Sequence, residues 1–136
     1  MPPPLPRSLG VVGLGLMGAS LARAARASDP ALRVVAVEPR PEVREAALRD
    51  GVAQVALAEP GPALAGCALV VLCTPIAEIE ALLGPVSGLL ADGAVLSDVG
   101  GAKERVAARA AGAVRPGVAF VGAHPMFGGH GGYGGA

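Results

Sequence analysis

The chain has 136 residues, of which 52% are hydrophobic, and its 11 basic and 11 acidic side chains give a formal net charge of zero. This length fits one domain and allows a buried core. The balanced charge argues against nucleic-acid or acidic-membrane partners, because both require clustered positive charge.

Cysteine usage and the N-terminal sequence indicate the compartment. Cys67 and Cys73 make neither a disulfide framework nor a metal site at their spacing, and we interpret both as reduced packing residues. The N-terminal segment has no apolar run of the length that a secretory signal needs. These features predict a cytoplasmic protein with no membrane partner and no metal.

The predicted elements begin after a proline-rich segment, 1–8, which we expect to be a flexible tail. A short apolar run ending in glycine follows at 9–15. Small and apolar residues at 16–28 then suit a helix packed closely on a sheet. This order predicts a strand, a tight turn and a helix.

Apolar runs and helical patterns alternate along the rest of the chain. The predicted strands lie at 33–38, 53–57, 68–73, 94–99 and 118–123. The predicted helices lie at 41–50, 76–84 and 102–114, with a helical turn at 62–66. We expect the helix that begins at Ile76 to be interrupted at Gly84 and Pro85. The alternation predicts an α/β fold, with a doubly wound parallel sheet covered by helices on both faces.

Three glycines after the first strand, Gly13, Gly15 and Gly18, form the pattern G-x-G-x-x-G. In this context they suit a tight turn, close approach to a pyrophosphate, and close contact between helix and strand. Leu16 and Met17 lie within the same turn and are predicted cofactor contacts. Together with the alternating elements, the pattern indicates a Rossmann-type dinucleotide-binding domain over residues 9–127.

Glu38 ends the second predicted strand 20 residues after Gly18, where the fingerprint places an acidic residue. Its carboxylate can accept hydrogen bonds from the adenosine ribose, and its charge would repel a 2′-phosphate. This pattern favours NAD over NADP. Two other interpretations stay open: Glu38 is a solvated strand end, or the nearby Arg40 holds a phosphate.

Residues Cys73, Thr74 and Pro75 follow the fourth predicted strand and are expected to border the cofactor, because ligands bind at the carboxyl ends of parallel strands. Pro75 is equally compatible with a role that only starts the next helix. Cys73 is interpreted as a strand residue and not as a nucleophile, since no sequence feature supplies a base for it.

Four segments together resemble the prephenate and arogenate dehydrogenase family of tyrosine biosynthesis. They read GLGLMGASLA, CTP, SDVGGAKERV and GAHPMFGG, and the resemblance runs from about Leu9 to Gly129. The most specific of them is GAHPMFG. The resemblance implies an NAD-dependent enzyme that oxidises prephenate or arogenate by hydride transfer, with loss of CO2 making the ring aromatic.

The resemblance also implies roles for single residues. His124 of the HP motif would accept the proton of the ring hydroxyl, a role that a neutral imidazole can fill. Asp98 and Lys103 match the family motif D-x-x-S-x-K and imply a cofactor contact at Asp98. The motif's serine falls at Gly101, and an acidic residue common in relatives is replaced by His130. From the residues alone, Asp98 and Lys103 are also readable as a helix cap and a solvated helix face.

Relatives in this family continue into a helical domain that forms a homodimer and closes the substrate cleft, and we expect that domain to be absent from this chain. The glycine-rich residues 128–136 are predicted to be disordered. Two alternatives remain: a dinucleotide-binding domain without turnover, and a fragment of a hydroxyacid or imine reductase of similar fold.

Overall fold

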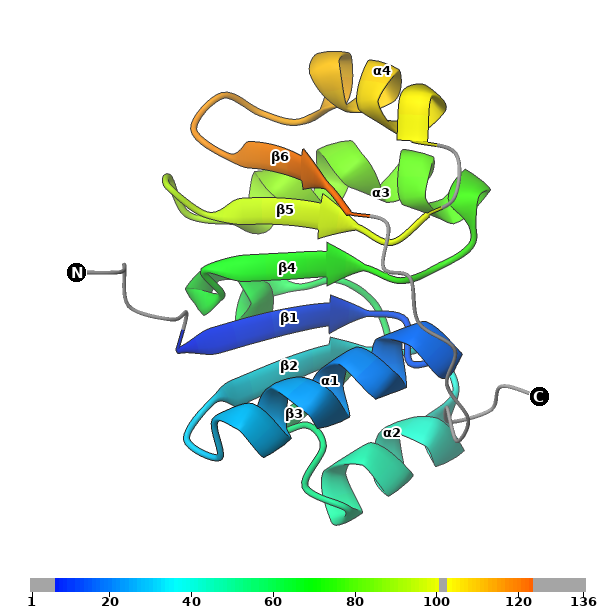
Figure 1. The fold of residues 1–136 in the computed structure, drawn as a ribbon, viewed down its shortest axis with the longest axis vertical. Helices are drawn as coiled ribbons and strands as arrows, with labels where there is room; N and C mark the ends of the chain where they lie inside the picture. The colour runs from blue at the N-terminus through cyan, green and yellow to red at the C-terminus, as the bar shows by residue number, and fades with distance from the viewer. Residues whose placement is uncertain (1–6, 101–102, 124–136) are drawn as a thin grey trace.

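The computed structural model describes residues 7–100 and 103–123, and it contains one sheet of parallel strands (Figure 1). The strand order is β3-β2-β1-β4-β5-β6. The strands are β1 (Ser8–Val12), β2 (Arg33–Val37), β3 (Val55–Leu57), β4 (Leu69–Leu72), β5 (Val95–Asp98) and β6 (Ala119–Gly122). The predicted Rossmann-type α/β fold is therefore confirmed, with its order reversing between β1 and β4.

Helices cover both faces of this sheet. They are α1 (Leu16–Ser28), α2 (Pro41–Arg49), η1 (Pro62–Gly66), α3 (Ile76–Leu89) and α4 (Lys103–Ala113). Figure 1 shows α1 and α2 in front of the sheet and α3 behind it. Among the described residues, no helix combines the length and the apolar character needed to cross a membrane.

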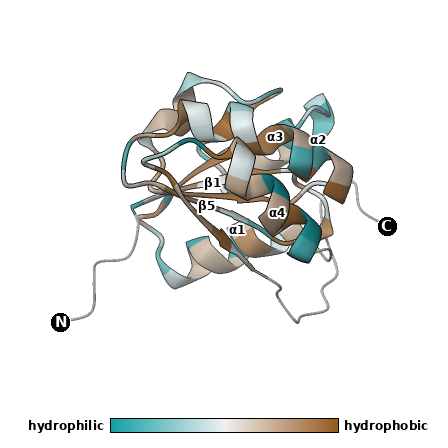
Figure 2. Ribbon diagram, turned by 90° about the horizontal axis from the view of Figure 1, so that it is seen from above, coloured by the Kyte–Doolittle hydropathy of each residue, from teal (hydrophilic) through white to brown (hydrophobic). Residues whose placement is uncertain are grey.

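Alternation along the strands divides the buried side chains into two cores. On β2, Val34 and Ala36 join the core under α1 and α2, whereas Val35 and Val37 face the core that holds α3 and α4. This period of two is what a strand buried on both faces requires. In Figure 2 the strands are brown, the colour of hydrophobic residues, between helices with teal outer segments.

Helix α3 corrects one prediction, because it continues through Gly84 and Pro85 to Leu89. A proline inside a helix removes one backbone hydrogen bond, which the sequence pattern takes as an interruption. Here Leu83 and Val86 lie on either side of Gly84 and Pro85, and both side chains are fully buried. Packing on both sides of Pro85 therefore holds one continuous helix.

Candidate functional site

The loop between β1 and α1 uses its three glycines for three different reasons. Gly13 has φ +96°, and a Cβ atom there would lie 3.0 Å from the Cys73 carbonyl oxygen. A Cβ atom at Gly18 would lie 1.8 Å from the carbonyl oxygen of Gly13, so only glycine lets α1 approach the loop this closely. A Cβ atom at Gly15 would have no neighbour within 4 Å among the described residues. The loop is thus closely packed at Gly13 and Gly18, whereas the space next to Gly15 is open.

Gly15 is the N-cap of α1. Because glycine has no side chain, no side-chain oxygen accepts a hydrogen bond from the first backbone N–H groups of this helix. The first turn of α1 contains no acidic side chain. Backbone N–H groups at a helix start carry partial positive charge and lack intrahelical acceptors, so they bind anions well. The open space at Gly15 therefore fits a phosphate or pyrophosphate group approaching the backbone.

Glu38 lies directly after β2, and only 3% of its surface is exposed. Its Oε1 accepts a hydrogen bond from the Leu14 backbone N–H at 3.1 Å, which ties the carboxylate to the glycine loop. Its Oε2 accepts one from the Arg40 backbone N–H at 3.0 Å. The interpretation of Glu38 as a solvated strand end is wrong, because the backbone folds around the carboxylate and excludes water.

Arg40 forms an ion pair with Glu38 through two more hydrogen bonds. Nε donates to Oε2 at 2.9 Å and Nη2 donates to Oε1 at 3.1 Å. Burial by itself raises the pKa of Glu38, but the hydrogen bonds from Arg40 and Leu14 outweigh it and hold that pKa below the ordinary value. The same pair raises the pKa of Arg40, so both groups are charged at neutral pH.

The ends of β4 and the following residues border the glycine loop. The Cys73 N–H donates to the Val12 carbonyl at 2.7 Å, and the Thr74 Cγ2 atom packs near Gly13. The Thr74 hydroxyl is buried and has no hydrogen-bond partner among the described residues. Burial, helped by the charge of Asp98, raises the pKa of Cys73 to about 12, which agrees with its interpretation as a thiol that does not act as a nucleophile.

Asp98 ends β5 and is fully buried. Its Oδ2 accepts hydrogen bonds from the Gly100 N–H and from Lys103 Nζ, each at 2.9 Å, while its Oδ1 has no partner among the described residues. The Ala123 N–H donates to the Asp98 carbonyl at 3.0 Å. Lys103 is therefore tied to the strand end, which corrects the alternative that it lies on a solvated helix face. Asp98 Oδ1 and the Thr74 hydroxyl therefore lie at the same sheet edge, both without a partner in the part of the chain that the structure describes.

The predicted site residues that the structure describes thus come together at one edge of the sheet. The predicted base His124 lies outside the described residues, as do Gly101 and His130, the two positions that depart from the family pattern. Within the described ranges, no group of three or more His, Cys, Asp or Glu side chains could hold a metal ion. Sequence reasoning missed the ion pair of Arg40 with Glu38, and it missed the buried oxygens of Thr74 and Asp98 that have no partner in the described ranges.

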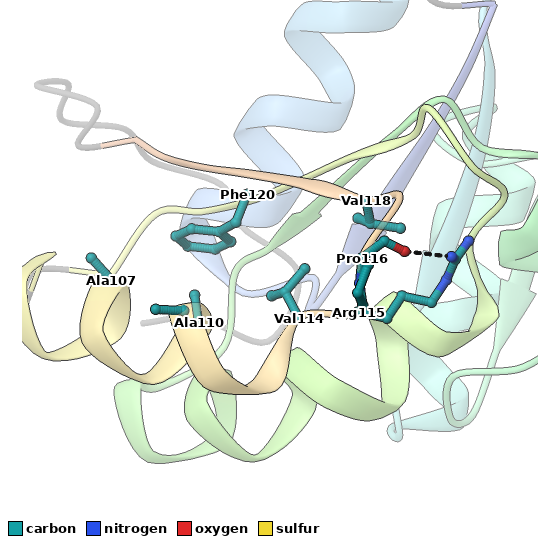
Figure 3. Close-up of a pocket in the computed structure, with 8 residues that line it drawn as sticks. Ala107, Ala110, Val114, Arg115, Pro116, Val118 and Phe120 are labelled. Atoms are coloured by element: carbon teal, nitrogen blue, oxygen red, sulfur yellow. Dashed lines mark hydrogen bonds between the residues drawn. The ribbon is translucent and has the colours of Figure 1, made fainter.

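Away from this edge, a hollow of about 430 Å³ lies between α4 and β6 (Figure 3). It is lined mainly by apolar side chains such as Val114, Val118 and Phe120. Arg115 also lines this hollow, but its guanidinium donates hydrogen bonds to the Asp92 carboxylate and to the backbone carbonyls of Leu90 and Pro116. None of the predicted cofactor contacts lines this hollow, so the sheet edge is the better candidate for a nucleotide.

Comparison with known proteins identifies relatives of the chain. The family model for the nucleotide-binding domain of prephenate dehydrogenase matches residues 21–136, a range that begins after the glycine loop. A prephenate dehydrogenase of Bacillus subtilis is 30% identical over 122 residues, which make up 88% of this chain and 33% of that protein. The chain therefore spans about a third of the length of this relative.

Two solved structures share the fold. Arogenate dehydrogenase of Synechocystis is 31% identical, with a TM-score of 0.77 over 87% of this chain and 40% of that one. Prephenate dehydrogenase of A. aeolicus, in complex with hydroxyphenyl propionate and NAD+, is 22% identical, with a TM-score of 0.76 over 88% of this chain and 42% of that one.

Proposed function

The chain belongs to the family of prephenate dehydrogenase nucleotide-binding domains, and from this we propose that it binds NAD at the carboxyl edge of its sheet. The observation that carries the proposal is the open space at Gly15, beside a helix start without a side-chain cap and near the buried carboxylate of Glu38. A phosphate site and an acceptor for ribose hydroxyls stand together there, as a dinucleotide requires.

The residues present also fit the nicotinamide half of the cofactor. Buried polar atoms are normally hydrogen-bonded, and neither the Thr74 hydroxyl nor Asp98 Oδ1 has a partner among the described residues, so these two atoms can accept hydrogen bonds from, or donate them to, polar groups of a ligand. The two residues follow or end neighbouring strands, β4 and β5, next to the point where the strand order reverses. In this proposal the glycine loop binds the pyrophosphate and Glu38 binds the adenosine ribose. Thr74 and Asp98 contact the nicotinamide half of the cofactor.

We propose further that the chain takes part in the oxidation of prephenate or arogenate. When bound, NAD supplies the acceptor for the hydride that leaves the ring carbon. His124 would take the proton of the ring hydroxyl, because an adjacent base must remove it as the carbon becomes a carbonyl. The family match, which includes residue 124, supports this role. Asp98 and Lys103 hold the end of β5 to the start of α4 and to Ala123, which directly precedes this histidine.

A domain that binds the dinucleotide without turning over substrate is the second candidate. Gly101 stands where the family motif has a serine, which favours this alternative. The appearance of NADH at 340 nm with prephenate or arogenate, measured beside a binding titration, separates the two candidates. Restoring serine at position 101 should raise turnover if the alignment of that motif is correct.

Calorimetric titration with NAD and with NADP tests the cofactor assignment. We expect NAD to bind more tightly, because the buried charge of Glu38 disfavours a 2′-phosphate. Glu38→Ala should narrow the difference between the two affinities. Equal affinities in the wild-type chain, or tighter binding of NADP, would contradict the preference, and binding of neither would contradict the nucleotide site itself.

A further inference from the structure

The carboxylate of Glu38 has no acceptor position left for a ribose in this structure. A carboxylate offers about four lone-pair positions, two on each oxygen. Oε1 accepts from the Leu14 N–H and from Arg40 Nη2, and Oε2 accepts from the Arg40 N–H and from Arg40 Nε. A ribose diol brings two more donors, so two of these hydrogen bonds must break before the sugar can bind Glu38.

The two hydrogen bonds that can break are those of the Arg40 guanidinium. The N–H donors of Leu14 and Arg40 belong to the backbone, and their positions follow from the loop and the strand end. The guanidinium is carried on a side chain that is 38% exposed, whereas the side chain of Glu38 is only 4% exposed. Its departure frees one position on each carboxylate oxygen, which is the arrangement that two vicinal hydroxyls need.

We infer that Arg40 is a specificity-determining residue, whose guanidinium competes with the adenosine ribose for Glu38 and, once displaced, lies beside the 2′ position. This inference rests on the proposed NAD site. In the complex with NAD the displaced guanidinium loses its ion pair, so Arg40 weakens binding of NAD. In the complex with NADP the guanidinium pairs with the 2′-phosphate, because a planar fork suits phosphate oxygens. Arg40 therefore narrows the preference for NAD that Glu38 creates.

Arg44 provides a matched control near the same strand end. Its Nη1 atom donates to the backbone carbonyls of Glu38 and Pro39, each at 2.9 Å. Arg44 thus places a positive charge near the same strand end, but these two hydrogen bonds go to backbone carbonyls and not to the Glu38 carboxylate. A general loss of positive charge would affect Arg44→Ala and Arg40→Ala alike, whereas competition for the carboxylate predicts an effect of Arg40→Ala alone.

The experiment is a calorimetric titration of wild type, Arg40→Ala, Arg40→Lys and Arg44→Ala with NAD and with NADP, at one salt concentration. We expect Arg40→Ala to tighten NAD binding about two- to fivefold, the range set by a partly exposed ion pair. It should weaken NADP binding about tenfold or more, because a hydrogen bond between charged groups is lost. Arg40→Lys should lie between wild type and Arg40→Ala, and Arg44→Ala should leave the ratio of the two affinities unchanged.

Opposite changes for the two cofactors distinguish competition from a structural role. If Arg40→Ala weakened NAD and NADP equally, or left both unchanged, the inference would be wrong while the NAD site stood. An equal change of the ratio in Arg44→Ala would also overturn it. If wild type bound neither cofactor, the proposed function itself would fail. Thermal denaturation of each variant checks that the domain remains folded.

Discussion

Larger side chains at two glycines of the loop between β1 and α1 should have different consequences: at Gly18 they should lower stability, and at Gly15 they should abolish NAD binding. A Cβ atom at Gly18 would stand 1.8 Å from the Gly13 carbonyl oxygen, and real contacts of this kind are not shorter than 3.0 Å. Helix α1 must therefore move away from the loop by about 1.2 Å in Gly18→Ala, the difference between these two distances. Overpacking of this kind typically costs about 1–3 kcal/mol, from a total stability of about 5–15 kcal/mol.

Gly15→Val should leave the fold intact and abolish NAD binding. Within the described part of the chain, a Cβ atom at this position would meet no atom within 4 Å beyond its own chain neighbours, and the φ of Gly15 is −71°, which any residue adopts. The side chain would fill the space through which the pyrophosphate reaches the backbone. Loss of two charge-assisted hydrogen bonds, at about 1.5–3 kcal/mol each, corresponds to roughly 10²–10⁴ in affinity.

Thermal denaturation and calorimetric titration of both variants test this contrast. Gly18→Ala should melt roughly 4–15 °C below wild type, and Gly15→Val should melt within a few degrees of it while losing NAD. Gly112→Val is the matched control, because a Cβ atom at that exposed position of α4 also has no neighbour within 4 Å among the described side chains and backbone. If Gly15→Val bound NAD normally, or if Gly18→Ala were as stable as wild type, the assignment of roles in the loop would be refuted.

Three further predictions concern the titratable groups. Because the pKa of Cys73 is about 12, iodoacetamide should modify Cys73 far more slowly at pH 8 than it modifies a free thiol, as mass spectrometry can measure. Because the pKa of Glu38 is lowered by folding, its contribution to stability is present above the ordinary value of about 4.3 and is lost as pH falls through the folded value. As pH falls below about 4.3, the free energy of unfolding measured in urea should therefore decrease more for wild type than for Glu38→Gln. In any form of the protein that turns over substrate, His124→Asn should reduce kcat about 10²–10⁴-fold while calorimetry shows little change in NAD affinity, and an unchanged kcat would remove His124 from the mechanism.

Much of this fold follows from local patterns in the sequence. The glycines of the first loop and Glu38 could be found from spacing alone, because a dinucleotide site needs them at fixed positions after consecutive strands. The path of α3 through Pro85 could not, since burial of Leu83 and Val86 outweighs the lost backbone hydrogen bond. Local rules assign each residue a preference, whereas the outcome depends on contacts made across the sheet.

Side-chain pairing in the site was harder to predict for a different reason. The sequence places Arg40 two residues after Glu38, but the rotamer of Arg40 decides whether its guanidinium covers the carboxylate or faces solvent. Likewise, Lys103 and Gly100 both donate to Oδ2 of Asp98, which leaves Oδ1 without a partner among the residues that the structure describes. These pairings arise from the packing of several elements at one edge of the sheet, which residue spacing along the chain does not specify.

The most direct test of the NAD site is an NMR titration of the ¹⁵N-labelled chain with NAD. The largest amide shifts should fall in four segments at the sheet edge: 13–18, 38–40, 73–74 and 98–100. The amides that line the hollow between α4 and β6, including those of Val114 and Phe120, should stay within experimental error. Shifts concentrated around that hollow, or an unchanged spectrum at saturating NAD, would contradict the proposed site.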